Sequence, residues 1–280
     1  MFFEALALIT SVTNALGSVF IAKGMKGSTP IVASFYSVLI QAFVLTAILV
    51  TRFPYLNAVA VSYFALGGVM SLGVGRLLNF SAMKGLGVAK TSALIGSSPV
   101  LTTLLSIAVL SERPDISTIL GAVTVAVGVV LISGATGFKI EKTLLIGLAS
   151  AFSYSLSNLA SKTGVTLQPD AFLSATTGAA AGFLFTAAYI AATKQTNRLR
   201  INRLSLSYFA ACGLLSSAGW LTMMTALETG SVSVVTTIVY SYPLFTLLFT
   251  RLLIKDEKLT TRTILGSALI VAGVATVTLL

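Results

Sequence analysis

The chain has 280 residues, of which 56% are hydrophobic and only 9% are charged, and its mean hydropathy is +0.97. Soluble domains carry roughly 25% charged residues, so this composition excludes an ordinary soluble protein and indicates an integral membrane protein. The net charge of +10 then reflects loops at a membrane surface rather than a nucleic-acid partner. With no histidine and one cysteine, Cys212, we expect no metal, no cofactor and no intramolecular disulfide.

The apolar residues occur in runs of about 20, the length that an α-helix needs to cross about 30 Å of hydrocarbon. Charged or turn-forming breaks separate the runs, for example at 23–27 and 255–258. No positively charged segment precedes the first run, so we expect it to remain as a helix rather than to be cleaved. The runs predict ten membrane-spanning helices, at about 2–22, 31–51, 60–82, 89–110, 116–133, 143–161, 171–193, 205–227, 232–254 and 263–280.

The sequence is internally duplicated. Ala82 and Pro99 correspond to Ala226 and Pro243 at an offset of 144 residues. Five helices per copy is an odd number, so the second copy must enter the membrane from the opposite side, as in transporters with inverted repeats. The predicted fold is an all-α integral membrane protein with ten transmembrane helices, in which two inverted five-helix repeats, 1–134 and 143–280, surround a central cavity.

The distribution of lysine and arginine predicts the orientation. The connections after the odd-numbered spans hold fourteen of these residues and the opposite face holds three. Cytoplasmic loops of membrane proteins are enriched in lysine and arginine, which places the rich face in the cytoplasm and both termini outside. Short loops and the lack of organelle signals favour a prokaryotic plasma membrane.

The first and sixth spans each carry a polar stripe at helical spacing. The stripes consist of Thr10, Thr13, Asn14, Gly17 and Ser18 in the first span, and of Ser150, Ser153, Tyr154, Ser157, Asn158 and Ser161 in the sixth. Hydroxyl and amide groups can bind a solute in either hydrogen-bonding direction, but serine and glycine also allow membrane helices to pack closely. Packing is the better interpretation of any single serine, whereas two matching stripes favour a cavity. Asn14, Tyr154, Ser157 and Asn158 are candidate binding residues.

The third and eighth spans carry Arg76 and Trp220 at equivalent positions, and Asn79 follows Arg76 by one turn. A charge within a membrane is costly, so Arg76 is expected to face a wet cavity. There it could anchor a carboxylate or phosphate, although an interfacial or structural arginine is an equally good interpretation. Trp220 could stack on a solute or on a cation, or simply pack.

The fourth and ninth spans contain Ser98-Pro99 and Tyr242-Pro243. A proline inside a helix removes one hydrogen bond and kinks the helix. Two kinks at matching positions predict hinges beside the site, with purely structural bends as the alternative. Ser98 and Tyr240 are candidate solute contacts, and Tyr240 is also a candidate gate.

Small residues mark the fifth and tenth spans. Gly121 and Gly128 in the fifth correspond to Gly266 and Gly273 in the tenth. Glycines seven residues apart on one helical face predict close helix packing, within the fold or, as the alternative, between protomers.

Acidic residues are few. The eight present lie mostly in predicted loops, with Glu4 and Glu228 near span ends. The sequence therefore does not predict a buried carboxylate relay for protons, and facilitated diffusion, exchange or coupling through substrate charge fits better.

The duplicated pattern resembles the EamA repeat of the drug/metabolite transporter superfamily over essentially the whole chain. The first copy has Ala82, Ser98-Pro99, Glu112-Arg113, Leu120-Gly121 and Gly128, and the second has Ala226, Tyr242-Pro243, Asp256-Glu257-Lys258, Leu265-Gly266 and Gly273. The resemblance implies two five-helix repeats, small-molecule export or uptake, and a cavity lined by the first, third and fourth helices of each repeat. It also implies cytoplasmic termini, against which we prefer the lysine and arginine count.

These features together predict a secondary transporter that moves small polar organic solutes, such as amino acids or related metabolites, by alternating access. A flippase for lipid-linked substrates and a membrane-embedded lipid-modifying enzyme are the alternatives. The expected partners are a small-molecule solute and the lipid bilayer, and the prediction is compatible with a monomer. No catalytic residue is expected.

Overall fold

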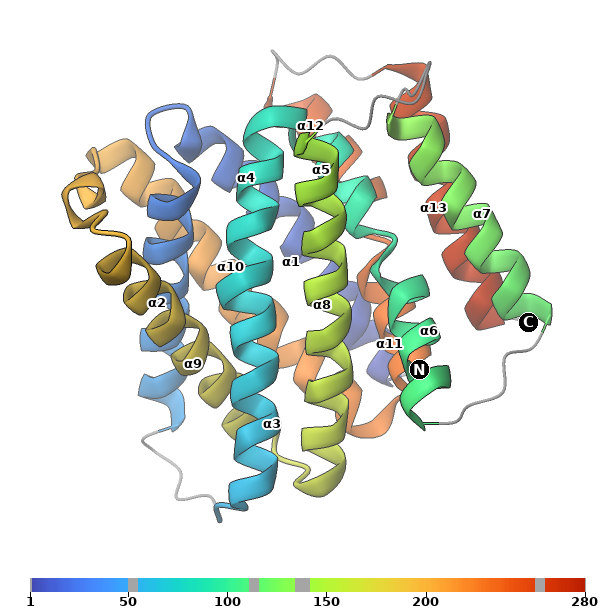
Figure 1. Cartoon of the computed structure of the whole chain (residues 1–280), viewed down its shortest axis with the longest axis horizontal. Helices are drawn as coiled ribbons and strands as arrows, with labels where there is room; N and C mark the ends of the chain where they lie inside the picture. The colour runs from blue at the N-terminus through green and yellow to red at the C-terminus, as the bar shows by residue number, and fades with distance from the viewer. Residues whose placement is uncertain (1, 50–54, 111–115, 134–141, 255–259, 280) are drawn as a thin grey trace.

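The computed structural model describes residues 2–49, 55–110, 116–133, 142–254 and 260–279. Regular secondary structure within these ranges is entirely helical (Figure 1). The helices of the first half are α1 (Phe2–Met25), α2 (Pro30–Leu49), α3 (Ala58–Gly68), the π-helix η1 (Val69–Gly75), α4 (Arg76–Leu86), α5 (Val88–Ile95), α6 (Ser98–Leu110) and α7 (Ile116–Ser133). Those of the second half are α8 (Lys142–Leu167), α9 (Ala171–Ala192), the short 3₁₀ turn η2 (Thr196–Leu199), α10 (Arg203–Thr229), α11 (Val232–Val239), α12 (Pro243–Leu253) and α13 (Thr261–Leu279).

Seven helical segments in the described residues are long and apolar enough to cross a membrane: Phe2–Met25, Pro30–Leu49, Ala58–Leu86, Lys142–Leu167, Ala171–Ala192, Arg203–Thr229 and Val234–Leu253. They coincide with seven of the predicted spans. The other three predicted spans, 89–110, 116–133 and 263–280, contain α5 with α6, α7, and α13. The protein is therefore a multi-pass membrane protein, and the count of ten crossings remains a prediction.

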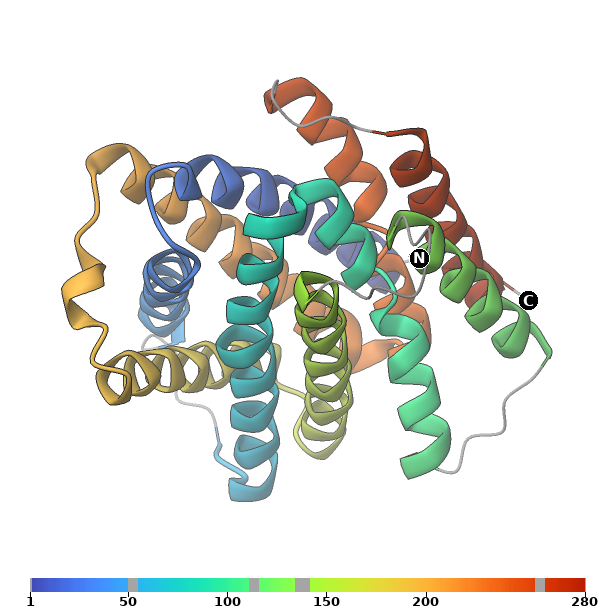
Figure 2. The same cartoon turned by 45° about the horizontal axis from the view of Figure 1, so that its top comes forward.

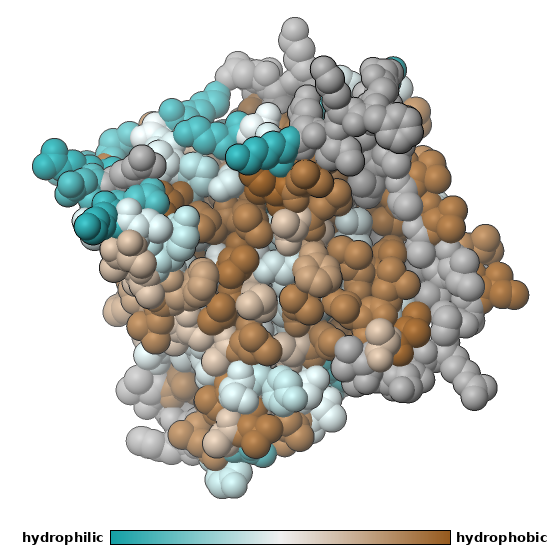
Figure 3. Space-filling model, viewed as in Figure 1, coloured by the Kyte–Doolittle hydropathy of each residue, from teal (hydrophilic) through white to brown (hydrophobic). Residues whose placement is uncertain are grey.

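The surface agrees with a membrane environment. Large apolar side chains point outward along the helices, for example Phe43, Leu184 and Leu214 with 73%, 65% and 55% of their surface exposed. Figure 3 shows hydrophobic side chains over the middle of the molecule and hydrophilic ones gathered at its upper left edge. A belt of exposed hydrophobic side chains on this scale is expected where lipid, rather than water, covers the protein.

The fourth and ninth spans each contain a short turn next to the predicted proline. α5 ends at Ile95 and α6 begins at Ser98, while α11 ends at Val239 and α12 begins at Pro243. Pro243 occupies the first position of its helix, where a missing N–H costs nothing. Both predicted proline positions thus lie where a short turn separates two helical stretches of one span.

The third span contains an unexpected π-helix. Residues 69–75 form η1 between α3 and α4, so one helical segment runs continuously from Ala58 to Leu86. Ser153 of α8 donates a hydrogen bond to the Met70 carbonyl at 2.6 Å, and Ser150 donates one to the Gly75 carbonyl at 2.8 Å. These two hydrogen bonds join α8 to η1 near both of its ends.

The two halves pack through two antiparallel helix pairs. In the first, Gly17 of α1 lies against Cys212 of α10, and Gly24 lies against Phe209. In the second, α8 lies beside the α3–η1–α4 segment, as Figures 1 and 2 both show. There Gly67 contacts Ser161 and Gly85 contacts Thr143, so residue numbers rise along one helix as they fall along the other.

Helices α7 and α13 pack against each other at one edge of the molecule (Figures 1 and 2). A Cβ atom added to Gly128 would lie 2.8 Å from the Gly266 carbonyl oxygen, and one added to Gly273 would lie 2.7 Å from that of Gly121. A real Cβ atom does not fit at such distances, so glycine is needed for this approach. The prediction that these four glycines pack helices within the fold is confirmed.

Candidate functional site

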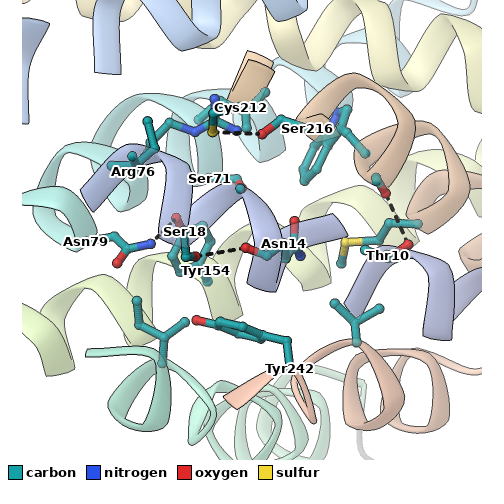
Figure 4. A pocket seen from close by; sticks show the side chains of 18 of the residues that line it. Thr10, Asn14, Ser18, Ser71, Arg76, Asn79, Tyr154, Cys212, Ser216 and Tyr242 are labelled. Carbon is teal, nitrogen blue, oxygen red and sulfur yellow. Dashed lines mark hydrogen bonds between the residues drawn. The ribbon is translucent and has the colours of Figure 1, made fainter. Parts of the chain in front are cut away.

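A cavity of about 90 Å³ lies where the two halves meet (Figure 4). Its lining comes from α1, the η1–α4 segment, α5, α8, α10 and the break between α11 and α12. A water molecule needs roughly 10–15 Å³ measured in this way, so the space can hold several waters or one small solute. Much of the lining is polar: Thr10, Asn14, Ser18, Ser71, Arg76, Asn79, Tyr154, Ser216, Trp220, Tyr240 and Tyr242.

Arg76 lies at the start of α4, directly after the π-helix, and only 7% of its surface is exposed. The end of α4 at Leu86 is about 15 Å away at 1.5 Å per residue, so Arg76 lies well inside the helical segment Ala58–Leu86. Its Nη2 atom donates a 2.9 Å hydrogen bond to Oε1 of Gln41. Its Nη1 atom is buried without a partner among the described residues.

Gln41 fixes the guanidinium from α2. The side chain is fully buried, and its Nε2 atom donates to the Ser216 carbonyl of α10 at 3.3 Å. One amide thus links three helices and holds one end of Arg76 beside the cavity. Gln41 is not among the residues predicted from the sequence, although a lone glutamine within the apolar 31–51 run is a usable signal because buried amides require partners.

Two more residues of the cavity lining have a polar atom that is buried without a partner in the described part of the chain. They are Asn79, whose Oδ1 atom is an acceptor, and Trp220, whose Nε1 atom is a donor and lies close to Gly178 of α9. The other end of Asn79 is engaged, because Nδ2 donates to the Tyr154 hydroxyl at 3.4 Å. A buried polar group without a partner costs roughly 1–3 kcal/mol, so water or solute is expected to pair with Asn79 Oδ1 and with Arg76 Nη1.

Three tyrosines form one side of the cavity. The ring centroids of Tyr154 and Tyr240 are 6.4 Å apart, and those of Tyr240 and Tyr242 are 6.3 Å apart. The interruption between α11 and α12 places the last two, since Tyr240 follows α11 and Tyr242 precedes α12. Aromatic faces attract cations and apolar groups. This side of the cavity therefore suits a cationic or apolar group of a solute, whereas Arg76 suits an anionic one.

The predicted polar stripe of α1 contributes Asn14, Gly17 and Ser18 to the cavity lining. Thr10 also lines it, and its hydroxyl lies 2.7 Å from that of Thr222 of α10. The stripe therefore both joins the two halves and faces the cavity.

Six of the nine predicted binding residues line the cavity: Asn14, Arg76, Asn79, Tyr154, Trp220 and Tyr240. The other three lie behind them. Ser98 donates to the Ala151 carbonyl at 2.9 Å, and Ser157 donates to the Gly67 carbonyl at 2.7 Å. Asn158 accepts a 3.4 Å hydrogen bond from the Tyr240 hydroxyl and donates to Thr102 at 3.2 Å.

The α8 stripe therefore serves mainly to pack helices. Ser150, Ser153 and Ser157 all donate to carbonyl groups of the α3–η1–α4 segment. Within this stripe, only Tyr154 is among the cavity-lining residues. Pro99 and Pro243 are buried beside the helix breaks and do not line the cavity.

No curated protein matches this chain in sequence. A solved structure titled only "Crystal structure of protein" has a TM-score of 0.68 and 20% sequence identity, with 99% of this chain and 95% of that chain covered. That similarity shows a shared fold.

The sequence pattern of the EamA-like transporter family matches residues 1–134 and 141–279, which is nearly the whole chain in two copies. The helical architecture and the cavity between two halves agree with this match. The chain belongs to the EamA-like transporter family, within the drug/metabolite transporter superfamily of membrane proteins.

Proposed function

We propose that this transporter moves small polar organic solutes, such as amino acids or related metabolites, across the membrane by alternating access. The observation that carries the proposal is the half-engaged Arg76, whose Nη1 atom is buried at the central cavity without a partner among the described residues. A guanidinium at membrane depth is costly unless water or an anion reaches it. A solute carboxylate or phosphate is a suitable partner, because guanidinium pairs with planar oxyanions.

The proposed transport cycle uses two inverted five-helix repeats, 1–134 and 143–280. The first helix of one half packs on the third helix of the other, as α1 on α10 and α8 on the α3–η1–α4 segment. Each pair is antiparallel, and α7 and α13 make reciprocal glycine contacts. A two-fold axis in the membrane plane would produce this set of contacts, and movement of either half would open the cavity to one side.

In the proposed binding mode, Arg76 holds the anionic group of the solute. Asn14, Asn79 and Trp220 supply further hydrogen bonds, and Tyr154 with Tyr240 contacts the organic part. Ser98, Ser157 and Asn158 support these residues from behind. Pro99 and Pro243 act as hinges where the fourth and ninth spans are interrupted.

No acidic residue lines the cavity in the part of the chain that the structure describes. This supports exchange, facilitated diffusion or coupling through the charge of the solute rather than a carboxylate proton relay. We further propose that the lysine- and arginine-rich loops face the cytoplasm of a plasma membrane, with both termini outside.

Counterflow tests the proposal. The purified protein is reconstituted into proteoliposomes, and the vesicles are loaded with a panel of amino acids and small metabolites. The movement of each solute across the membrane is followed by mass spectrometry with and without a pH gradient. We expect selective exchange of a few anionic or zwitterionic solutes. If folded protein moved none of them but scrambled labelled lipids, the flippase alternative would replace this proposal.

Cys212 offers a second readout, because it is the only cysteine in the chain and lines the cavity. A small thiol reagent should inactivate the protein, and a transported solute should slow the reaction. The Cys212→Ser variant is the matched control. Its transport rate should be the same with and without the reagent. If Cys212 reacts equally fast at saturating solute, the solute does not occupy this cavity.

A further inference from the structure

Gln41 of α2 lies between two groups of opposite hydrogen-bonding character. On one side its Oε1 atom accepts from Nη2 of Arg76 at 2.9 Å, and on the other its Nε2 atom donates to the Ser216 carbonyl at 3.3 Å. A guanidinium can only donate and a carbonyl can only accept, so the two partners determine which end of the amide faces which neighbour. An amide therefore fits this position, whereas a carboxylate would turn an oxygen atom toward the Ser216 carbonyl.

The amide holds Arg76 without cancelling its charge. Arginine stays protonated at every physiological pH, and a neutral amide oxygen accepts from one of its N–H groups without adding a net charge. Among the residues that the structure describes, the other ionisable side chains of the cavity lining are Cys212 and three tyrosines, which are neutral at pH 7. The described lining therefore has one net positive charge, that of Arg76.

Gln41 acts from behind the cavity. Its side chain is fully buried and is not among the described residues that line the cavity, whereas Arg76 and Ser216 are. A solute in the cavity therefore meets the charge of Arg76 but does not touch Gln41. Any effect of Gln41 on the choice of solute must pass through the guanidinium, which makes Gln41 a positioning residue.

We propose that Gln41 sets the charge selectivity of the cavity, so that a solute with net negative charge is preferred over a neutral or zwitterionic solute of the same shape. This proposal rests on the proposed transport function and adds the charge class of the solute to it. The preference arises because the uncompensated guanidinium attracts an anion more strongly than it attracts a solute without net charge. A carboxylate at position 41 would form an ion pair with Arg76 and remove the preference.

Glutamate and glutamine are suitable probes, because they have nearly the same shape and differ by one negative charge at pH 7. In counterflow with the full-length protein, the apparent KM of wild type for glutamate should be roughly tenfold below that for glutamine, since one charge a few ångströms away contributes about this much in a partly hydrated site. Gln41→Glu should bring the two KM values together. An unchanged KM ratio in this variant would overturn the proposal.

Gln41→Leu separates charge from structure. This variant removes both hydrogen bonds of the amide but adds no charge, so it should lower the midpoint of thermal unfolding and still prefer glutamate. If Gln41→Leu lost the preference to the same extent as Gln41→Glu, Gln41 would have a structural role only.

A second measurement decides the proposal even where neither amino acid is transported. Trp220 is the only tryptophan and lines the same cavity, so quenching of its fluorescence in the purified protein reports which ions enter. Iodide should quench Trp220 severalfold better than caesium, after each ion is scaled to its quenching of N-acetyltryptophanamide, and Gln41→Glu should abolish the difference. Gln195→Glu, the matched control, adds the same charge outside the cavity lining and should behave as wild type.

The two measurements keep this proposal distinct from the transport function. Equal quenching by iodide and caesium in wild type would overturn the charge selectivity even if solutes were transported. The expected quenching pattern in a protein that transported no solute would support the role of Gln41 and contradict the proposed function alone.

Discussion

Arg76 and Gln41 show how a single charge is held within the membrane without being neutralised. The glutamine occupies Nη2 at 2.9 Å, and Nη1 is buried without a partner among the described residues. The cost of a charge within a membrane is the reason to expect Arg76 at a cavity, and both Arg76 and Asn79 line the cavity in the structure. The sequence could not identify Gln41 as the partner, because contacts between distant helices are not encoded in the periodicity of either helix.

The same limit applies to the α8 serines. Spacing correctly puts them on one face of a helix, but it does not say whether that face meets water or a carbonyl of another helix. Ser157 meets the Gly67 carbonyl at 2.7 Å. Tyr154 of the same stripe lines the cavity.

At the residue scale, Arg76→Ala should raise the apparent KM for an anionic solute roughly ten- to hundredfold, because hydrogen bonds to charged groups contribute about 1.5–3 kcal/mol. Arg76→Lys keeps the charge but not the planar geometry, and an intermediate value is expected. Arg251→Ala, which removes an exposed arginine of α12, is the control. Initial rates over a range of solute concentrations give the values, and an unchanged KM for Arg76→Ala would exclude the anchoring role.

At the scale of helices, the interruptions at Pro99 and Pro243 could be located from the sequence because proline removes a backbone donor. Their full extent could not, since it depends on how Gly96 and residues 240–242 pack. The η1 segment was unpredictable for a similar reason. A π-helix of seven residues changes the apolar pattern of a 29-residue segment too little to be detected.

Two serines of α8 donate hydrogen bonds to carbonyl groups of η1, so Ser150→Ala/Ser153→Ala should destabilise the protein. Each lost hydrogen bond costs about 0.5–1.5 kcal/mol, and the midpoint of thermal unfolding should fall by roughly 3 °C or more. Fluorescence of Trp220, the only tryptophan, follows the transition. Ser207→Ala removes an exposed hydroxyl that bonds within its own helix and should change nothing; equal midpoints in all three proteins would mean that the serines do not support η1.

The helix interruptions should matter for motion more than for binding. Pro99→Ala/Pro243→Ala restores backbone donors and should slow turnover severalfold while KM changes little. Pro30→Ala at the start of α2, where no break exists, is the matched control. Single-turnover and steady-state counterflow measurements separate the turnover rate from KM. A normal turnover rate in the double variant would mean that both prolines have only a structural role.

For the whole molecule, the sequence correctly predicted an all-helical, duplicated membrane protein, because hydropathy and internal repetition are properties of long segments. The path of the chain in space required the structure. The predicted breaks at 112–115 and 134–142 fall largely outside the described residues. Membrane orientation rests on the charge count alone.

Orientation can be measured in a Cys212→Ala background. Tyr55, 81% exposed, lies between α2 and α3, and Lys142, also exposed, begins α8 on the lysine-rich face. In intact cells, a membrane-impermeant maleimide should label Tyr55→Cys at once and Lys142→Cys only after permeabilisation. The reverse pattern would place the termini in the cytoplasm.

The pairing of Arg76 with Trp220 at equivalent positions of the two halves has an electrical consequence. Arg76 carries a positive charge and Trp220 carries none, so any change in the depth of α4 moves one positive charge through the electric field of the membrane. Moving that charge across the whole membrane changes the free energy by about 2.3 kcal/mol per 100 mV. A bound monoanion would cancel that charge. We therefore expect the loaded protein to reorient independently of membrane voltage and the empty protein to return at a voltage-dependent rate, which imposed potassium diffusion potentials can reveal.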